Sequence, residues 1–416
     1  MGVRRWWGHT TEGLPGPFWI VLAGTLVNRL GQFVETFLAL YLAGPRHLDT
    51  STVGVVVAAF GLGSFVSQPI GGYLADRIGR RLTLALGMVG TAAAFLVLAA
   101  VRDLVLIGIA AALSGLAIDL YRPAVQAIVA DLVEPRNRPR AFAMLYWAIN
   151  IGVAVSGVAG GYLAERSFWL LFVLDAATCL VFAALILRFV PETHRRASGG
   201  DGQGYGPALR DGLLLGLTGA LFLGAVVYMQ SLITLPLAVR ADGYGPDGFG
   251  IVYAVNPITV ILLQPLVVWA IDRLPAVPLL VGSALVMGFG FWLTALADTL
   301  VAFGLTIVVW TLGEIGFNAV GPALVANIAP TDLRGRYNGV MGVSFGASAF
   351  VAPLAGTWVF ENLGENTLWT LCFVLQGLSA AAILALRPMI RARQAALEAT
   401  ESAGSDGTAT NLAGSG

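Results

Sequence analysis

The sequence predicts an all-α membrane protein whose transmembrane helices form two pseudo-symmetric six-helix bundles. Three observations support this prediction: the composition, the recurrence of long apolar runs, and a motif pattern shared by the two halves. Hydrophobic residues make up 57% of the chain and charged residues only 12%, whereas a soluble domain carries about 25% charged residues. A chain with so little polar surface cannot cover a water-soluble globule.

The apolar runs give the number of spans, because a transmembrane helix needs about 20 mainly apolar residues. Twelve runs meet that requirement. The expected spans are 17–43, 52–74, 82–101, 104–130, 140–163, 167–189, 212–239, 249–271, 277–297, 299–328, 337–360 and 367–387. Span 1 contains Arg29 and Glu35 and lacks a small-residue cleavage site. We therefore interpret it as a retained helix and not as a removed signal peptide.

The arginines predict the orientation of these spans. Eighteen of the 24 basic residues, all arginine, fall in segments on the same side of the membrane as the N-terminus, and four fall in loops on the other side. Positively charged loops stay in the cytoplasm. Both termini are therefore expected to be cytoplasmic, in a multi-pass protein of the plasma (cell inner) membrane.

Composition also divides the chain into segments. We expect an N-terminal six-helix bundle (1–190), a cytoplasmic linker (191–211), a C-terminal six-helix bundle (212–389) and a disordered cytoplasmic tail (390–416). The glycine-rich run 199–206 is typical of a flexible linker. Its glycine spacing does not match a phosphate-binding loop, and no strand precedes it.

The two halves repeat each other at a constant offset of 196 residues. Gln68-Pro69 pairs with Gln264-Pro265, and Asp76-Arg77 pairs with Asp272-Arg273. Further pairs are Arg138 with Arg334, Arg140 with Arg336, Gly160 with Gly356, and Glu165 with Glu361. A repeat held over this distance predicts two bundles of similar architecture in parallel orientation.

Two motifs stand out within the first half. The run from Gly71 to Arg81 is a charged turn between two apolar spans, and such charges cannot lie in hydrocarbon. Its candidate functional residues are Gly72, Asp76, Arg77, Gly79, Arg80 and Arg81. In span 5, small residues at close spacing allow helices to approach each other. These residues are Gly152, Ser156, Gly157, Gly160 and Gly161.

Both motifs resemble those of the major facilitator superfamily, in particular its twelve-helix drug–proton antiporter (multidrug efflux) group. The loop fits G-x-L-a-D-R-x-G-R-[KR], the family's motif between helices 2 and 3. Span 5 is similar to the antiporter motif G-x-x-x-G-P-x-x-G-G, with Ser156 and Gly157 in place of its central Gly and Pro. The resemblance covers roughly 17–387. It implies the major facilitator fold, with a midplane substrate site between the halves.

The resemblance also implies roles for these motifs. The loop would act as a conformational latch that closes the cytoplasmic side, while a simpler alternative is that its positive charge only holds the loop inside. The second copy of the loop, 269–275, has lost the glycines, so we expect the latch in one half only. Two stretches, 144–150 and 311–315 followed by 335–340, are similar to a multidrug–proton antiporter subgroup that expels lipophilic cations. That subgroup has a span 10 carboxylate at the place of Glu314 and a span 5 aspartate where this chain has Leu145.

Charges inside spans are the best functional candidates, because each is unfavourable in lipid and normally faces the bundle interior. They are Arg29, Glu35, Asp119, Arg122, Asp175 and Glu314. Helices 1, 4, 7 and 10 line the central cavity in the family, and five of these six charges lie on three of them. The fourth helix adds Tyr228 and Gln230. Asp175, on span 6, is expected to be buried against a neighbouring helix.

Sequence spacing predicts how these side chains group. Asn28, Gln32 and Glu35 share one helical face, and Asp119 and Arg122 can form an intrahelical pair. The candidates for further cavity walls are Tyr146, Trp147, Asn150, Trp310 and Phe317. A carboxyl in an apolar cavity can load and release a proton as access alternates. Glu35 and Glu314 are therefore candidates for proton or substrate coupling, with a structural salt bridge such as Glu35–Arg122 as the alternative.

We expect a secondary transporter, driven by the proton gradient, that exports amphipathic or cationic small molecules by alternating access. The alternative is a proton-coupled importer of a small nutrient such as a sugar or an organic acid, and a third reading is a membrane sensor that transports nothing. No catalytic residues, cofactor or metal ligands are expected, so the chain is not predicted to be an enzyme. Its expected partners are the substrate and the lipid bilayer, not nucleic acid, and it is expected to be a monomer.

Overall fold

The computed structural model describes residues 14–134, 137–192, 206–271, 273–330 and 333–413. Within them the chain forms helices and no strand. The N-terminal half comprises α2 (Gly16–Leu30), α3 (Val34–Ala43), α4 (Thr50–Arg77), α5 (Arg80–Ala100), α6 (Leu104–Ile118), α7 (Tyr121–Leu132), α8 (Arg138–Arg166) and α9 (Phe168–Phe189). The C-terminal half comprises α11 (Gly212–Ile233), α12 (Leu235–Ala241), α13 (Pro246–Ile271), α14 (Ala276–Leu293), η2 (Thr294–Leu296), α15 (Leu300–Ile328), α16 (Arg334–Leu363) and α17 (Glu365–Ala413).

Ten segments of the described chain are long and apolar enough to span a membrane as single helical stretches. The remaining two of the twelve expected spans are present but broken. The first is divided into α2 and α3, and the fourth into α6 and α7. In the fourth span, Pro123 has no N–H to donate to the carbonyl of Asp119, and a proline inside a helix breaks its hydrogen-bond ladder. The apolar runs predict both spans to be continuous, and this prediction is wrong.

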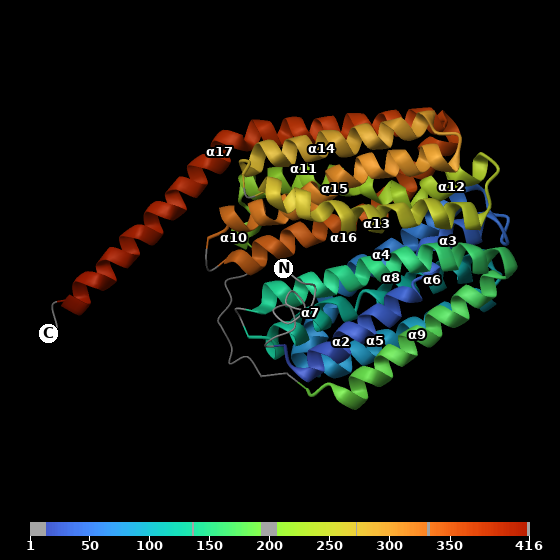
Figure 1. Ribbon diagram of the computed structural model, residues 1–416, viewed down its shortest axis with the longest axis horizontal. Helices are drawn as coiled ribbons and strands as arrows, with labels where there is room; N and C mark the ends of the chain where they lie inside the picture. Colours follow the sequence, from blue (N-terminus) through green and yellow to red (C-terminus); the bar gives the residue numbers. More distant parts are fainter. Residues whose placement is uncertain (1–13, 135–136, 193–205, 272, 331–332, 414–416) are drawn as a thin grey trace, which may run out of the picture.

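The two halves lie side by side, with the N-terminal half lower and the C-terminal half upper in Figure 1. We call the end that carries the short helix α10 (Gly206–Leu209) the linker end, and the opposite end the far end. The halves contact each other mainly through α8 with α13 and α4 with α16. The expected linker (191–211) lies largely outside the described residues, which resume at α10.

The hydrophobic cores differ between the two ends. At the linker end each half has its own core, with Ile128 and Phe182 in the N-terminal half and Leu214 and Leu324 in the C-terminal half. Towards the far end two cores contain residues of both halves: one joins Phe37 to Phe249, and the other joins Phe60 to Leu237. The largest shared cores of the described residues therefore hold the halves together towards the far end.

The C-terminal segment differs from the expected disordered tail. The structure continues α17 as one helix to Ala413, and Figure 1 shows it projecting away from the bundle. The stretch after Arg391 begins with alanine, arginine, glutamine and leucine. These residues have high helix propensity, which favours continuation of α17 over 392–399.

Candidate functional site

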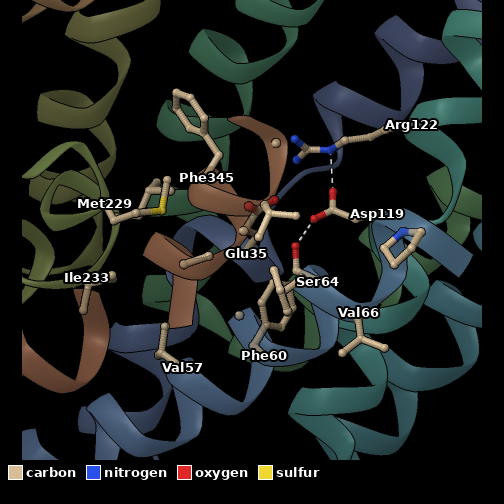
Figure 2. Close-up of a pocket in the computed structure, with 18 of the residues that line it drawn as sticks. Glu35, Val57, Phe60, Ser64, Val66, Asp119, Arg122, Met229, Ile233 and Phe345 are labelled. Atoms are coloured by element: carbon tan, nitrogen blue, oxygen red, sulfur yellow. Dashed lines mark hydrogen bonds and ion pairs between the residues drawn. The ribbon is translucent and has the colours of Figure 1, made fainter. Parts of the chain in front are cut away.

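A cavity of about 760 Å³ lies between the two halves. Its walls come from α3, α4, the α6–α7 junction, α11 and α16, and Figure 2 shows most of them. Aromatic and aliphatic side chains predominate. They are Leu38, Val57, Phe60, Phe65, Val66, Met229, Leu232, Ile233, Val343 and Phe345. The polar residues include Glu35, Ser64, Asp119, Arg122 and Asn338.

The cavity is closed at the far end and reaches the surface at the linker end. At the far end the backbone N–H of Ser51 donates to the Glu361 carboxylate over 2.8 Å, which joins α4 to α16. Towards the linker end the wall includes Pro69 and Asn338, and both are exposed. The structure therefore shows a state in which the space between the halves is accessible from the linker end.

Glu35 points into this cavity from the second residue of α3 (Figure 2). Gln32 Nε2 donates to its carboxylate over 2.8 Å, and Arg29 Nη1 donates to Gln32 Oε1 over 2.5 Å. Arg29 also donates to the hydroxyl of Tyr121. Arg29 therefore reaches Glu35 only through Gln32. The cavity thus contains a carboxylate that no arginine bridges among the described ion pairs.

The predicted face of Asn28, Gln32 and Glu35 is not formed. The break at Gly31 interrupts the helix, so the three residues do not follow one helical period. Asn28 instead donates to the thiol of Cys179 on α9, over 3.3 Å. Asn28 is therefore packed within the N-terminal half, and Glu35 faces the cavity.

Asp119 and Arg122 form the predicted ion pair, although it lies at the junction of α6 and α7 and not within one helix. Ser64 of α4 donates its hydroxyl to the other oxygen of Asp119 (Figure 2). Arg122 therefore pairs with Asp119, and the alternative pair between Glu35 and Arg122 is not formed. A paired arginine lets a charged aspartate persist beside an apolar cavity.

Glu314 lies in the C-terminal half and outside the walls of this cavity. It is 6% exposed and belongs to the unbroken helix α15. Asn256 Nδ2 of α13 donates to Glu314 Oε2 over 2.6 Å and to the hydroxyl of Thr311 over 2.9 Å. Tyr228 of α11 lies beside the Glu314 carboxyl group. Asn256 was not among the predicted site residues, although a polar amide within an apolar span is a signal that the sequence contains.

The other span 7 candidate, Gln230, has a packing role. Its side-chain amide donates to the carbonyls of Val226 and Ala352 and accepts from the hydroxyl of Thr234. It is 2% exposed and therefore holds α11 against α16. The proposed additional wall residues are absent from the described lining of the cavity. These are Tyr146, Trp147, Asn150, Trp310 and Phe317. The aromatic side chains that do line the cavity are those of Phe60, Phe65 and Phe345.

The charged loop between α4 and α5 folds against its own half. Arg80 forms an ion pair with Asp131 at the end of α7, and the backbone N–H groups of Arg80 and Arg81 donate to the Glu192 carboxylate. Gly79 has φ +101°, and a Cβ there would lie 2.5 Å from Glu192 Oε2. Glycine is therefore required at this turn. Arg77 donates to Tyr73 one turn earlier, while the surroundings of Gly72 and Asp76 lie outside the described part of the chain.

The small residues of α8 lie at close approaches on two sides. A Cβ at Gly152 would lie 2.5 Å from Arg29 Cβ in the same half. A Cβ at Gly161 would lie 2.6 Å from the carbonyl oxygen of Pro246 in the other half, and one at Gly157 3.1 Å from that of Gly250. Gly160 faces the rings of Phe33 and Phe37, while the Ser156 hydroxyl donates to the carbonyl of Val153. The α8 motif thus contacts both α2–α3 and α13.

Within the described residues, no cluster of three His, Cys, Asp or Glu side chains could hold a metal ion. Two six-span bundles with a cavity between them define a membrane transporter of the secondary class. The family model described as Major Facilitator Superfamily matches residues 21–255 and 232–409. The chain belongs to the Major Facilitator Superfamily.

The similar proteins are transporters of several kinds. The uncharacterized MFS-type transporter YqjV of Bacillus subtilis is 25% identical over 87% of this chain and 90% of its own length. A Na(+), Li(+), K(+)/H(+) antiporter of Planococcus maritimus is 26% identical, with 85% and 90% covered. The multidrug resistance protein MdtH of Cronobacter sakazakii is 28% identical, with 81% and 85% covered.

Solved structures support the fold alone. A crystal structure of a peptide transporter POT in complex with sulfate superimposes with a TM-score of 0.78 at 17% identity, covering 91% of this chain and 96% of that one. The human organic anion transporter MFSD10 gives a TM-score of 0.67 at 17% identity, with 89% and 100% covered.

Proposed function

We propose that this transporter exports amphipathic small molecules in exchange for protons, by alternating access. The observation that supports the proposal most directly is the cavity between the halves. It combines many apolar side chains with the carboxylate of Glu35, which no described arginine bridges. An apolar wall with one accessible negative charge suits a lipophilic molecule that carries a positive charge. Two relatives, a multidrug resistance protein and a cation–proton antiporter, carry names compatible with this proposal.

Proton coupling would use one carboxyl in each half. Glu35 lies beside the substrate cavity, and Glu314 lies in a buried cluster with Asn256 and Tyr228. A carboxyl in low-dielectric surroundings exchanges between protonated and charged forms when its exposure changes. Alternation between two open states supplies that change, so a proton bound from one side is released to the other.

The sidedness follows from the arginines. The linker end carries Arg80, Arg81, Arg210 and Arg393, which the positive-inside rule places in the cytoplasm. The described state would then be open to the cytoplasm and ready to bind cargo from inside. In this state the described contacts of Arg80 stay within its own half. We propose that the loop engages the C-terminal half when the linker end closes, which is the latch role.

Transport into inside-out membrane vesicles tests the function. The vesicles are given an acidic interior. If the protein is an exporter, added ethidium or tetraphenylphosphonium should accumulate inside while protons leave, which dissipates the pH difference. A nutrient importer would instead move protons in the same direction as its substrate and would not respond to these cations. Absence of both compound flux and proton flux over a panel of amphiphiles would overturn the exporter reading.

A further inference from the structure

The first span is broken where it enters the cavity. α2 ends at Leu30, and α3 begins at Val34, with Gly31, Gln32 and Phe33 between them. A break in a membrane helix leaves backbone N–H groups without their usual carbonyl partners, and these must be satisfied inside the protein.

Asp175 of α9 accepts from two of those groups, one of which, the Phe33 N–H, also donates to the carbonyl of Gly31 over 2.7 Å. Its Oδ2 accepts hydrogen bonds from the backbone N–H of Phe33 over 3.1 Å and of Val34 over 3.0 Å. Asp175 is 3% exposed and sits in the middle of a membrane helix. A buried carboxylate at the start of α3 also faces the positive end of that helix dipole.

The same face of α9 shapes the rest of the break. A Cβ on Gly31 would lie 2.2 Å from the hydroxyl oxygen of Thr178, so only glycine fits there. One turn after Asp175 on α9, the thiol of Cys179 accepts a hydrogen bond from the side-chain amide of Asn28. Three consecutive contacts, from Asp175, Thr178 and Cys179, therefore hold α9 against the break.

The break decides what the first span presents to the cavity. Glu35, Leu38 and Ala39 of α3 line the cavity, whereas none of its described lining residues comes from α2. On its opposite side α3 carries Phe37, whose ring lies edge-on to Phe249 of the other half at 5.6 Å. α3 is thus a short, separately anchored segment that presents its carboxylate to the cavity on one side and touches the opposite half on the other.

We propose that Asp175 is a positioning residue for Glu35. By accepting the two N–H groups at the start of α3, it fixes the direction in which α3 leaves α2, and with it the orientation of the Glu35 carboxylate in the cavity. Asp175 does not touch the substrate and carries no transported proton in this proposal. The inference rests on the proposed function of Glu35 in coupling.

Two substitutions separate an acceptor role from a charge role. Asp175→Asn keeps an acceptor oxygen of the same length, and coupled transport is expected to remain within about threefold of wild type. Asp175→Leu removes the acceptor, and coupled transport is expected to fall as far as in Glu35→Gln. Loss of transport in a well-folded Asp175→Asn protein would overturn the proposal, because it would show that the charge itself is required.

A double-mutant comparison tests whether Asp175 acts through Glu35. If it does, Asp175→Leu combined with Glu35→Gln transports no worse than Glu35→Gln alone. Multiplied losses would show that Asp175 supports transport by another route and would overturn the inference. The matched control is Ser379→Ala. Ser379 of α17 donates to the carbonyl of Ala220 on α11 over 2.8 Å, a buried contact between the corresponding helices of the other half.

Backbone hydrogen exchange provides a readout that does not depend on transport. In Asp175→Leu, the peptide that covers Phe33 and Val34 should exchange about tenfold faster, the ratio expected for one lost buried hydrogen bond. Ser379→Ala should leave this peptide unchanged. If wild type shows no coupled flux, the proposed function fails while exchange still tests the cap. If wild type and Glu35→Gln behave as proposed and Asp175→Leu transports normally, the positioning role alone fails.

Discussion

The two halves hold their intramembrane carboxyl groups in different ways. In the N-terminal half, Glu35 lies just after a helix break that Asp175 caps from a neighbouring helix. In the C-terminal half, Glu314 lies within the unbroken helix α15, and its partners Asn256 and Tyr228 come from adjacent helices. The repeat therefore preserves the architecture while the chemistry diverges. Glu35 is held by the capped start of α3 and by Gln32 of its own span, whereas Glu314 is held by side chains from other helices.

The two halves also differ in the charged clusters that they carry at the linker end. In the N-terminal half, Arg80 and Asp131 join α5 to α7. In the C-terminal half, Asp211 accepts from Tyr337 and from Arg393, which joins α11, α16 and α17. At the repeat offset, Arg80 corresponds to Ala276 and Asp131 to Asn327, so the second half cannot reproduce the first cluster. The first cluster belongs to the proposed latch, whereas the second ties helices of one half together.

The largest expected effect comes from Glu314. Glu314→Gln keeps the shape of the side chain and a partner for Asn256 but cannot bind and release a proton. We expect coupled export to fall by about 100-fold, near the upper end for coupled sites. The measurement is dye-driven proton efflux from proteoliposomes. Glu365→Gln, at a carboxylate that accepts from Trp369 at the far end, is the control and should transport normally. Unchanged active export by Glu314→Gln would refute its assigned role.

Glu35→Gln should have a smaller effect. Glu35 is more exposed than Glu314 and already shares a hydrogen bond with Gln32, so a glutamine can keep the local arrangement. We expect a loss of about tenfold in coupled export. Cationic substrates should lose more affinity than neutral ones if the carboxylate contacts cargo. Comparing ethidium with a neutral lipophilic compound in the same vesicles measures that difference, and equal losses for the two would assign Glu35 to proton transfer alone.

Sequence patterns predicted the fold well because hydrophobic length, arginine bias and an internal repeat are strong, redundant signals. They did not predict the breaks in the first and fourth spans, because an interrupted helix and a continuous one can have equally long apolar runs. Gly31 and Pro123 were the residues that carried this information.

The site was predicted in part. The charges inside spans, which are rare in lipid, included Glu35 and the Asp119–Arg122 pair of the cavity, whereas Glu314 lies outside its walls and its coupling role stays a prediction. Residue spacing along one helix could not show that Asp175 of α9 accepts hydrogen bonds at the start of α3, or that Asn256 donates to Glu314. Those contacts join residues 141 and 58 positions apart, and only tertiary packing brings them together.

Stability measurements test the contrast between the charged clusters that the two halves carry at the linker end. The first measurement concerns the α4–α5 turn. Gly79→Ala should destabilise the protein by about 3 kcal/mol, because φ +101° with ψ 153° is a backbone conformation that only glycine readily adopts and the new Cβ would meet Glu192 at 2.5 Å. Gly364→Ala is the matched control, since Gly364 has φ +88° and ψ 159° with nothing within 4 Å. It should lose only the backbone contribution, about 2 kcal/mol. Thermal unfolding in detergent measures both, and equal shifts would show that the Glu192 contact adds nothing.

The smallest expected effect concerns Asp211 at the other cluster. Its carboxylate accepts from the backbone N–H groups of Leu213 and Leu214 at the start of α11, as well as from Tyr337 and Arg393. Asp211→Ala should destabilise by about 2 kcal/mol, the upper end for a helix cap. Asp103→Ala removes a cap at α6 with two comparable backbone bonds and should lose about 1 kcal/mol. Equal losses would show that Tyr337 and Arg393 contribute no stability.

The pH dependence of that difference gives a further check. Although burial opposes ionisation, hydrogen bonds from Tyr337 and Arg393 hold the pKa of Asp211 below its ordinary value of 3.8. A carboxyl whose pKa is lower in the fold stabilises it fully above the unfolded pKa. That stabilisation is lost as the pH falls through the folded pKa. The difference in melting temperature between wild type and Asp211→Ala should therefore stay constant from pH 7 to about pH 5 and shrink below about pH 4. A difference that grew on acidification would contradict the assignment of this cluster as an ion pair that holds α17 to α11.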